Sequence, residues 1–364
     1  MKRATLYFVI LTLLLALAGC RAPAAPLYDT APAAANQKVY FNGTRAARVL
    51  QEGNTLFFDL QELAALLNGQ FTQTPGTTLH TASLTVGNIT LNYAAGAELP
   101  GDRLKAFYTG EAWFGPMENL PELLGYHPFT DAEAEATYYT LYPLAEELPK
   151  GVSVPTLMYH AVSDTCWGIE SLFVSPKNME QQLQYLTENG YTPIWFEDLG
   201  RADEFEKPVL LTFDDGYEDN YTDLFPLLKK YNVKATIFMI TGSLGEPYYL
   251  NTQQLQEMAA SGLVSFQSHT ISHPYLSELT EEQLQTELLG SKRELAKLTG
   301  KEPFVLCYPT GKYSAASLAA TRQHYQFGLL MSGKTYQTGQ DPLKITRKYI
   351  SRSTDLETFK NMIR

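Results

Sequence analysis

Two adjacent carboxylates, Asp214 and Asp215, follow the apolar run of residues 208–213 and precede Gly216. A continuous apolar run of this length is typical of a buried strand. Two carboxylates at the end of such a strand cost free energy unless a cation or a bound proton compensates their charge. The segment by itself therefore fits a metal or acid–base site and a solvated Asp-Gly turn equally well.

A second chemical signal is the histidine pair His269 and His273, which follows another predicted strand at residues 263–267. On one helical turn, side chains four residues apart point the same way, so both imidazoles could bind one metal ion. Zinc accepts imidazole and carboxylate ligands and leaves a position open for water in catalytic sites. The His-Glu-x-x-His motif of metallopeptidases requires a glutamate where this chain has Thr270, so that hypothesis is disfavoured.

The elements that must position these residues form a regular alternation from residue 154 onward. Strands are predicted at 154–159, 191–195, 208–213, 235–240, 263–267, 304–308 and 327–331, and helices at 176–189, 225–231, 252–260, 280–299 and 315–322. Such alternation predicts a β/α barrel, in which the chemistry lies at the carboxyl ends of the strands.

The segment 212–216 (Thr-Phe-Asp-Asp-Gly), followed by the segment 269–274 (His-Thr-Ile-Ser-His-Pro), resembles the polysaccharide deacetylase family. This family is also called the NodB homology domain or carbohydrate esterase family 4. The resemblance covers residues 151–364. It implies an α/β fold, a distorted and incomplete (β/α) barrel, and a divalent metal cofactor. Zinc is the first expectation for that metal, with cobalt, nickel or iron as alternatives.

The resemblance also implies a role for each residue of the two segments. Asp215, His269 and His273 are expected to bind the metal, and Asp214 is expected to be the general base. The backbone N–H of Tyr217 is expected to stabilise the oxyanion.

The general acid needs a separate argument. Many family members take it from a Leu-x-His segment near the C-terminus, but the only histidine here after His273 is His324, at a predicted helix end. His160 instead ends the first predicted strand of the region. This order, together with the segment 308–313 (Tyr-Pro-Thr-Gly-Lys-Tyr), resembles the branch of biofilm poly-N-acetylglucosamine deacetylases, whose motif order is circularly permuted. That branch implies His160 as the general acid.

The same resemblance suggests the surroundings of the site and the substrate. Tyr308 and Pro309 are expected to wall the pocket, and Arg347 to orient Asp214, with a structural role for Arg347 as the alternative. The implied reaction is hydrolysis of N-acetyl groups from a glycan, with poly-N-acetylglucosamine favoured. The alternatives are a peptidoglycan deacetylase and a non-catalytic glycan-binding lipoprotein.

The N-terminus predicts secretion and a lipid anchor. A basic start at residues 2–3 and an apolar run over residues 6–17 are typical of a signal peptide, and the run is too short to span a bilayer comfortably. The following Leu-Ala-Gly-Cys resembles a bacterial lipobox. We therefore expect residues 1–19 to be removed and Cys20 to be acylated, which anchors an extracytoplasmic lipoprotein of the bacterial cell envelope to the membrane.

An internal repeat lies between a predicted linker, residues 20–37, and the barrel. Within residues 38–143, the segment 56–68 aligns with the segment 113–125, 57 positions later, and each copy reads as an aromatic strand followed by a short amphipathic helix. The pattern resembles the small α+β domain named for the N-terminus of copper amine oxidases. A stalk, spacer or wall-binding role is expected.

Strand-like segments follow each copy, at residues 83–93 and 137–142. His80 and His127 are isolated in the sequence, so no copper-ligand cluster is predicted there. Cys166 and Cys307 are the cysteines left after Cys20. Secretion permits a disulfide between them, and their spacing matches no cysteine zinc cluster.

Charge narrows the choice of partners. Without the signal peptide the chain carries 39 acidic residues against about 26 basic ones. Such a surface repels nucleic acid and anionic polymers but tolerates a neutral or cationic glycan. An N-acetylated glycan is therefore the expected partner, nucleic acid is not expected, and the protein is expected to be a monomer.

Overall fold

The computed structural model describes residues 32–74, 79–96, 103–331 and 333–364. The predicted signal peptide, Cys20 and most of the linker lie outside these residues. The chain divides into two compact units: one contains Ala46–Leu120 and the described residues before Val39, and the other contains Val39–Arg45 and Pro121–Arg364. This division falls earlier than the predicted boundary between residues 143 and 151.

The first unit holds both copies of the strand of the predicted repeat. Its strands are β1 (Ala33–Ala34), β4 (Val49–Glu52), β5 (Thr55–Asp59), β6 (Gln70–Thr74), β7 (Leu79–Val86), β8 (Ile89–Gly96), β9 (Leu104–Lys105), β10 (Phe107–Tyr108) and β11 (Trp113–Gly115). β5 leads into α2 (Leu60–Leu66) and β11 leads toward α3 (Leu120–Leu123), so the predicted order of strand and helix is confirmed in both copies. The prediction of one strand over residues 83–93 is wrong, because a turn at Gly87, with φ +57°, divides it into the hairpin β7–β8.

A small antiparallel sheet belongs to the second unit. It consists of β2 (Lys38–Phe41), β3 (Thr44–Arg45), β12 (Tyr126–Asp131) and β13 (Ala136–Leu141), which covers most of the predicted strand at 137–142. Its side chains pack within the unit. Tyr138 is buried with Ala296, the ring of Tyr142 stacks 4.4 Å from Phe304, and the Thr140 hydroxyl accepts a hydrogen bond from the Glu302 N–H.

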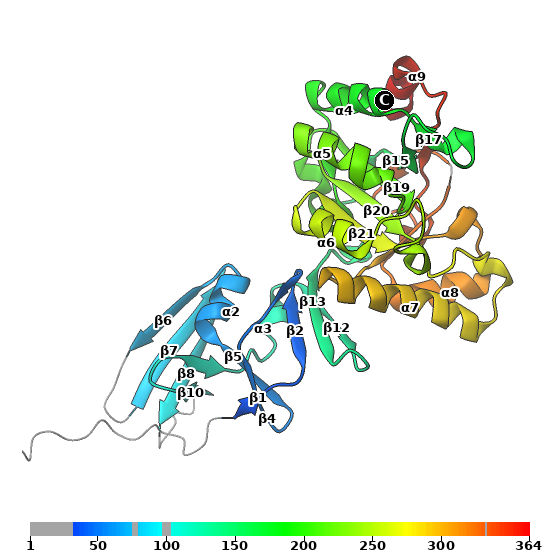
Figure 1. Cartoon of the computed structure of the whole chain (residues 1–364). Helices are drawn as coiled ribbons and strands as arrows, with labels where there is room; N and C mark the ends of the chain where they lie inside the picture. The colour runs from blue at the N-terminus through cyan, green and yellow to red at the C-terminus, as the bar shows by residue number, and fades with distance from the viewer. Residues whose placement is uncertain (1–31, 75–78, 97–102, 332) are drawn as a thin grey trace, which may run out of the picture. The chain divides into compact units, whose positions relative to one another are not determined.

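The predicted barrel is present as a curled, incomplete parallel sheet of eight strands in the second unit (Figure 1). The order is β23-β22-β21-β20-β19-β15-β25, with β18 paired to β19. The strands are β15 (Thr156–Tyr159), β18 (Thr192–Ile194), β19 (Pro208–Asp215), β20 (Ala235–Met239), β21 (Val264–Ser268), β22 (Val305–Cys307), β23 (Phe327–Leu329) and β25 (Lys348–Tyr349). β23 and β25 end this order, and a single parallel bridge between Leu329 and Ile345 links β23 to the segment just before β25.

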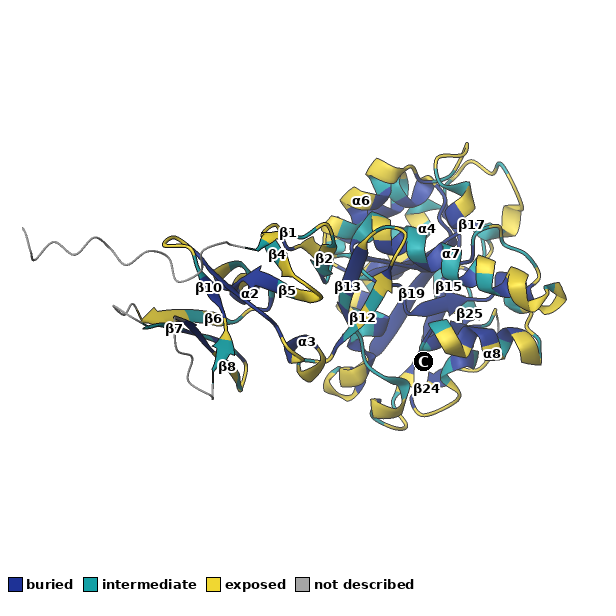
Figure 2. Cartoon of the chain, turned by 90° about the horizontal axis from the view of Figure 1, so that it is seen from below, coloured by how far each residue is buried: buried dark blue, intermediate teal, exposed yellow. Residues whose placement is uncertain are grey.

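Helices surround this sheet, and their exposed residues lie on the outward faces while the strands are buried (Figure 2). They are α4 (Pro176–Glu188), α5 (Phe225–Tyr231), α6 (Thr252–Ala260), α7 (Glu281–Thr299), α8 (Ala315–His324) and α9 (Leu356–Ile363). Side chains cap two of these helices: the Ser175 hydroxyl accepts a hydrogen bond from Asn178 N–H, and Thr280 forms a capping box with Gln283.

Several short elements of the second unit were not predicted: β14 (Ser153–Val154), β16 (Ala161–Val162), β17 (Phe173–Val174), β24 (Tyr336–Gln337), β25 and α9. Strands of two residues carry no periodic signal, so only their partners reveal them. Among the described residues, no helix is long and apolar enough to span a membrane.

The strand register brings the predicted site residues to one end of the sheet. Tyr159, the last residue of β15, pairs with Phe213, so His160 and Asp214 follow at the same level. Asp215 pairs with Met239, and Met239 with Ser268, which precedes His269. Because parallel strands end at the same edge, three distant segments of the sequence meet there.

Candidate active site

A cavity of about 510 Å³ opens at the carboxyl ends of the strands. Most of the predicted site residues line it: His160, Asp214, Asp215, Tyr217, His269, His273, Tyr308 and Arg347. Pro309 is buried next to Tyr308 but is not among the described residues that line the cavity.

Asp215, His269 and His273 form a group that could hold a metal ion. One ligand atom from each lies within 4.8 Å of the others, and His269 Nε2 is 3.5 Å from Asp215 Oδ1. Two ligand atoms bound tetrahedrally to one zinc ion at about 2.1 Å would lie about 3.4 Å apart. The spacing and the donor types therefore fit a divalent cation.

The hydrogen bonds of His269 also fit this role. Its Nδ1 lies 2.8 Å from the carbonyl oxygen of Cys307, which accepts a hydrogen bond from this nitrogen and leaves Nε2 free to face Asp215. Burial lowers the pKa of His269, which favours the neutral imidazole that a metal ligand needs.

The histidine pair does not lie on a helical turn, and the prediction was wrong on this point. Residues 269–275 form an irregular loop in which Thr270 has φ +68° and His273 has φ +57°. Glu287 from α7 holds the loop by accepting hydrogen bonds from the N–H groups of Ile271 and Ser272. The two imidazole rings are 4.7 Å apart because of the loop geometry.

Asp214 forms a buried bidentate ion pair with Arg347, with both nitrogen–oxygen distances at 2.7 Å. Burial alone would raise the pKa of the Asp214 carboxyl, but the guanidinium outweighs it and holds this pKa well below its ordinary value. Arg347 is 1% exposed and also donates to the Thr212 hydroxyl and the Leu330 carbonyl. The predicted orienting contact is therefore present.

A second possible ligand set, Asp214, His269 and Cys307, fits a cation less well. Both oxygens of Asp214 are taken by Arg347. Burial raises the pKa of the Cys307 thiol well above its ordinary value, so it remains protonated, whereas a metal ligand must be a thiolate. Cys307 instead lies 3.1 Å from Arg347 Nη2 and 3.5 Å from Asp214 Oδ2.

His160 lies across the cavity from the metal ligands. Its Nε2 is 3.9 Å from Asp214 Oδ2, and its Nδ1 is buried without a hydrogen-bond partner among the residues described. The Asn220 amide donates to its carbonyl and thereby fixes the backbone. Burial lowers the pKa of His160, and the Asp214 carboxylate opposes that shift.

The backbone around Asp215 directs Tyr217 into the cavity. Asp215 has φ +74° and Gly216 has φ +80°, and a side chain at Gly216 would collide with Met239. Tyr217 and Tyr249 pair in an isolated antiparallel β-bridge. Its two hydrogen bonds are donated by neighbouring residues, from Glu218 N–H to the Tyr248 carbonyl and from Leu250 N–H to the Gly216 carbonyl. The bridge therefore does not use the Tyr217 N–H. An oxyanion donor needs an N–H that is not already engaged in this way.

The alternative acid, His324, lies at the end of α8, where its Nε2 contacts Gln285 on α7. It does not line the cavity. Cys166 and Cys307 are both free cysteines, the first exposed and the second buried.

Sequence reasoning missed several residues that support the site. Asp219 accepts hydrogen bonds from Val162 N–H and from the Asn220 amide, and so ties the His160 segment to the loop after Asp215. Burial raises the pKa of Asp219 to about 6. Its place four residues after Asp215 was the only sequence signal. Cys307 and Thr212 gave no signal.

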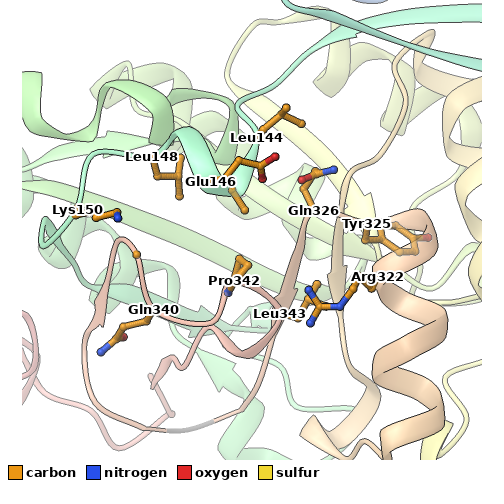
Figure 3. A pocket seen from close by; sticks show the side chains of 12 residues that line it. Leu144, Glu146, Leu148, Lys150, Arg322, Tyr325, Gln326, Gln340, Pro342 and Leu343 are labelled. Atoms are coloured by element: carbon orange, nitrogen blue, oxygen red, sulfur yellow. The ribbon is translucent and has the colours of Figure 1, made fainter.

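A second cavity of about 500 Å³ lies between the connector after β13, α8 and the loop after β24 (Figure 3). Leu148, Arg322 and Gln340 are among the residues that line it. It contains none of the predicted site residues.

Comparisons with known proteins identify relatives of this chain. Residues 201–326 match the family described as polysaccharide deacetylase. Among curated relatives, YxkH of Bacillus subtilis is 41% identical over 186 residues, which are 50% of this chain and 65% of that protein.

Two further relatives carry more specific names. The peptidoglycan-N-acetylmuramic acid deacetylase PdaA of Bacillus subtilis is 31% identical over 160 residues, 43% of this chain and 57% of the relative. The poly-beta-1,6-N-acetyl-D-glucosamine N-deacetylase of Escherichia coli is 30% identical over 139 residues, 33% of this chain and 21% of the relative. The chain thus spans only part of the length of each of these relatives.

Solved structures extend the match. A polysaccharide deacetylase from Bacillus cereus aligns with a TM-score of 0.57 and 26% identity, over 81% of this chain and 99% of its own. The Streptococcus pyogenes deacetylase PplD, solved with acetate, aligns with a TM-score of 0.55 and 31% identity, over 59% of this chain and 99% of its own. Because PplD is matched over nearly its whole length at that identity, this chain belongs to the polysaccharide deacetylase family.

Proposed function

We propose that the protein is a metal-dependent N-deacetylase of an N-acetylglucosamine-containing polysaccharide. The observation that carries the proposal is the pairing of two adjacent aspartates with different partners. Asp214 is held ionised by Arg347, whereas Asp215 faces two imidazoles at metal-ligand spacing. One carboxylate is thus kept for proton transfer and the other for a cation.

Asp215, His269 and His273 would hold the divalent cation. When bound, such a cation supplies Lewis acidity, which lowers the pKa of water and polarises an acetamide carbonyl. Asp214 accepts the proton of the attacking water, at an oxygen that Arg347 fixes in place. The Tyr217 N–H stabilises the negative charge on the former carbonyl oxygen.

His160 donates a proton to the nitrogen of the leaving sugar amine. Burial lowers the pKa of His160 and so disfavours the protonated form that a general acid needs, whereas the nearby Asp214 carboxylate opposes that shift and stabilises the imidazolium. The products are acetate and a free amine on the glycan. Tyr308 forms part of the pocket wall around the substrate.

Poly-N-acetylglucosamine is the favoured substrate. Support comes from the position of His160 after the first barrel strand and from the similarity to the Escherichia coli relative. Peptidoglycan is the second candidate. The similarity to PdaA supports it, because the identity of 31% is almost the same as the 30% identity to the Escherichia coli relative. Zinc is the proposed metal, because two imidazoles and one carboxylate suit it.

We also propose that the protein is a lipoprotein anchored through Cys20 on the outer face of the membrane. The basic start, apolar run and Leu-Ala-Gly-Cys sequence support this location. The repeat-containing N-terminal part would then act as a spacer between the membrane and the barrel.

Acetate release from defined glycans tests the activity. The wild-type protein should release acetate and leave free amines on β-1,6-linked N-acetylglucosamine oligomers, less on β-1,4-linked oligomers or peptidoglycan fragments, and none in excess chelator. Acetate from peptidoglycan alone would reverse the order of substrates. No acetate from any of them, with one equivalent of metal bound, would favour a glycan-binding lipoprotein.

A further inference from the structure

The rim of the active-site cavity is unusually apolar for an exposed surface. Five of the exposed large apolar side chains in the described parts of the chain either line this cavity, as Ile169 and Met331 do, or lie within three residues in sequence of a residue that lines it. They are Ile169, Tyr248, Tyr275, Tyr313 and Met331. Exposed apolar residues gathered around one cavity are typical of a binding surface rather than of scattered surface positions.

Trp167 and Tyr248 form a rigid aromatic pair on this rim. Their rings stack with centroids 4.6 Å apart and planes 14° apart. The edge-to-face contacts of Trp167 with Tyr217 and Phe173 fix the indole from two further sides. Tyr217 lines the cavity, so the pair continues directly from the reaction site.

Tyr248 is held in place at an energetic cost. Its backbone has φ +72°, a conformation that is rare for bulky side chains, and the residue is 55% exposed. The Glu218 N–H donates to its carbonyl and holds this turn against the loop after Asp215. Because Tyr248 stacks on Trp167 yet stays about half exposed, part of its surface remains open to a ligand.

We propose that Trp167 and Tyr248 form a platform that stacks on a pyranose ring of the glycan next to the sugar being deacetylated. An aromatic face attracts the polarised C–H groups on the apolar face of a sugar ring, and a rigid pair loses little entropy on binding. This inference rests on the proposed function. It makes the enzyme one that recognises a chain of sugars rather than a single N-acetylglucosamine.

Charge around the platform favours a glycan over a lipid surface. Exposed acidic residues lie near it in sequence on three segments: Asp164, Glu170, Glu218 and Glu246, of which Glu170 is paired with Arg352. Anionic phospholipids would be repelled by these carboxylates, whereas a neutral glycan is not, and a partly deacetylated cationic one is attracted.

The test is the dependence of KM on oligomer length in the full-length, metal-loaded protein, with β-1,6-linked N-acetylglucosamine oligomers of one to six sugars. Tyr248→Asn removes the ring but suits a positive φ, so the turn is preserved. In wild type, KM should fall with length. In Tyr248→Asn it should rise about tenfold for long oligomers, with kcat changed less than KM.

Two matched variants complete the design. Tyr248→Phe keeps the ring and should keep the length dependence. Leu123→Ala removes an exposed apolar side chain outside the cavity and should behave as wild type. Equal length dependence in Tyr248→Asn and wild type would overturn the platform, as would an equal loss for every length.

Binding separates this inference from the proposed reaction. If wild type releases no acetate, the proposed function fails, and the platform is then tested by the Trp fluorescence change on adding the hexamer. The apparent affinity measured from that fluorescence change should be about tenfold weaker in Tyr248→Asn than in wild type. Binding of wild type, but not Tyr248→Asn, to vesicles of phosphatidylglycerol and phosphatidylethanolamine would show a membrane-docking surface and refute the glycan platform.

Discussion

The ion pair between Arg347 and Asp214 should be the strongest polar interaction that holds the site together. Both groups are almost fully buried, and two charge-assisted hydrogen bonds of 2.7 Å join them. Arg347→Met removes the guanidinium but keeps most of the side-chain volume. Breaking a buried pair by removing one partner costs about 3–5 kcal/mol, because the other charge stays buried without compensation.

The assay is urea unfolding of the metal-free protein at pH 7, so that lost metal affinity does not contribute. The cost of Arg347→Met should be much smaller in an Asp214→Asn background, which gives a coupling energy of about 2–3 kcal/mol. Lys360→Met, at a more exposed pair with Glu357, serves as the control and should cost less. A cost below about 1 kcal/mol for Arg347→Met, or an equal cost in both backgrounds, would refute the reasoning.

Four further predictions follow from the structure and the sequence. His160→Ala should keep metal and fold while kcat falls by roughly 10²–10⁴, and loss of the metal or a near wild-type rate would exclude it as the acid. Cys20→Ala should release the protein from membranes, as fractionation would detect, and unchanged membrane attachment with the signal cleaved would contradict acylation. Burial raises the pKa of Asp219 to about 6. Between about pH 4 and pH 6 the folded protein therefore keeps a proton on this carboxyl that the unfolded chain has lost, so the free energy of unfolding falls as the pH rises through this range. Asp219→Asn should remove this slope from a plot of the urea midpoint against pH. A chain of residues 151–364 should release acetate from short oligomers but melt at a lower temperature than the full chain, because it lacks β12 and β13, and folded but inactive protein would show that the N-terminal part contributes to the site.

The elements with strong periodic or capping signals were predictable. The predicted strand at 208–213 and the predicted helix at 280–299 both correspond to elements of the structure at almost the predicted bounds, and Thr280 caps that helix. Their signals are local, since burial on both faces requires a continuous apolar run and a helix start requires a side-chain acceptor. The same local signals placed Asp214 and His269 at strand ends.

The geometry of the histidine pair was not predictable from spacing. A separation of four residues fits a helical turn, yet here a loop with two positive φ angles brings the imidazoles together. That conformation depends on Glu287, which lies on a different element and accepts two of the loop's N–H groups. Contacts between distant segments decide such loops, and local propensity does not report them.

Long-range contacts also explain the supporting residues that were missed. Cys307 contacts the Asp214–Arg347 pair through its thiol and His269 through its carbonyl. Nothing in its neighbourhood in the sequence indicates either contact. The unit boundary differs from the predicted one for the same reason, since β12 and β13 pack within the second unit although the repeat assigns them to the first.

Titration of the metal-free wild-type protein with zinc, followed by acetate release from an N-acetylglucosamine hexamer, tests the central claim most directly. The account predicts no acetate without metal, activity that rises linearly and saturates near one equivalent of zinc, and no restoration in His269→Ala. Full activity in the metal-free protein, or equal restoration of His269→Ala, would contradict the assignment of Asp215, His269 and His273 as the metal site.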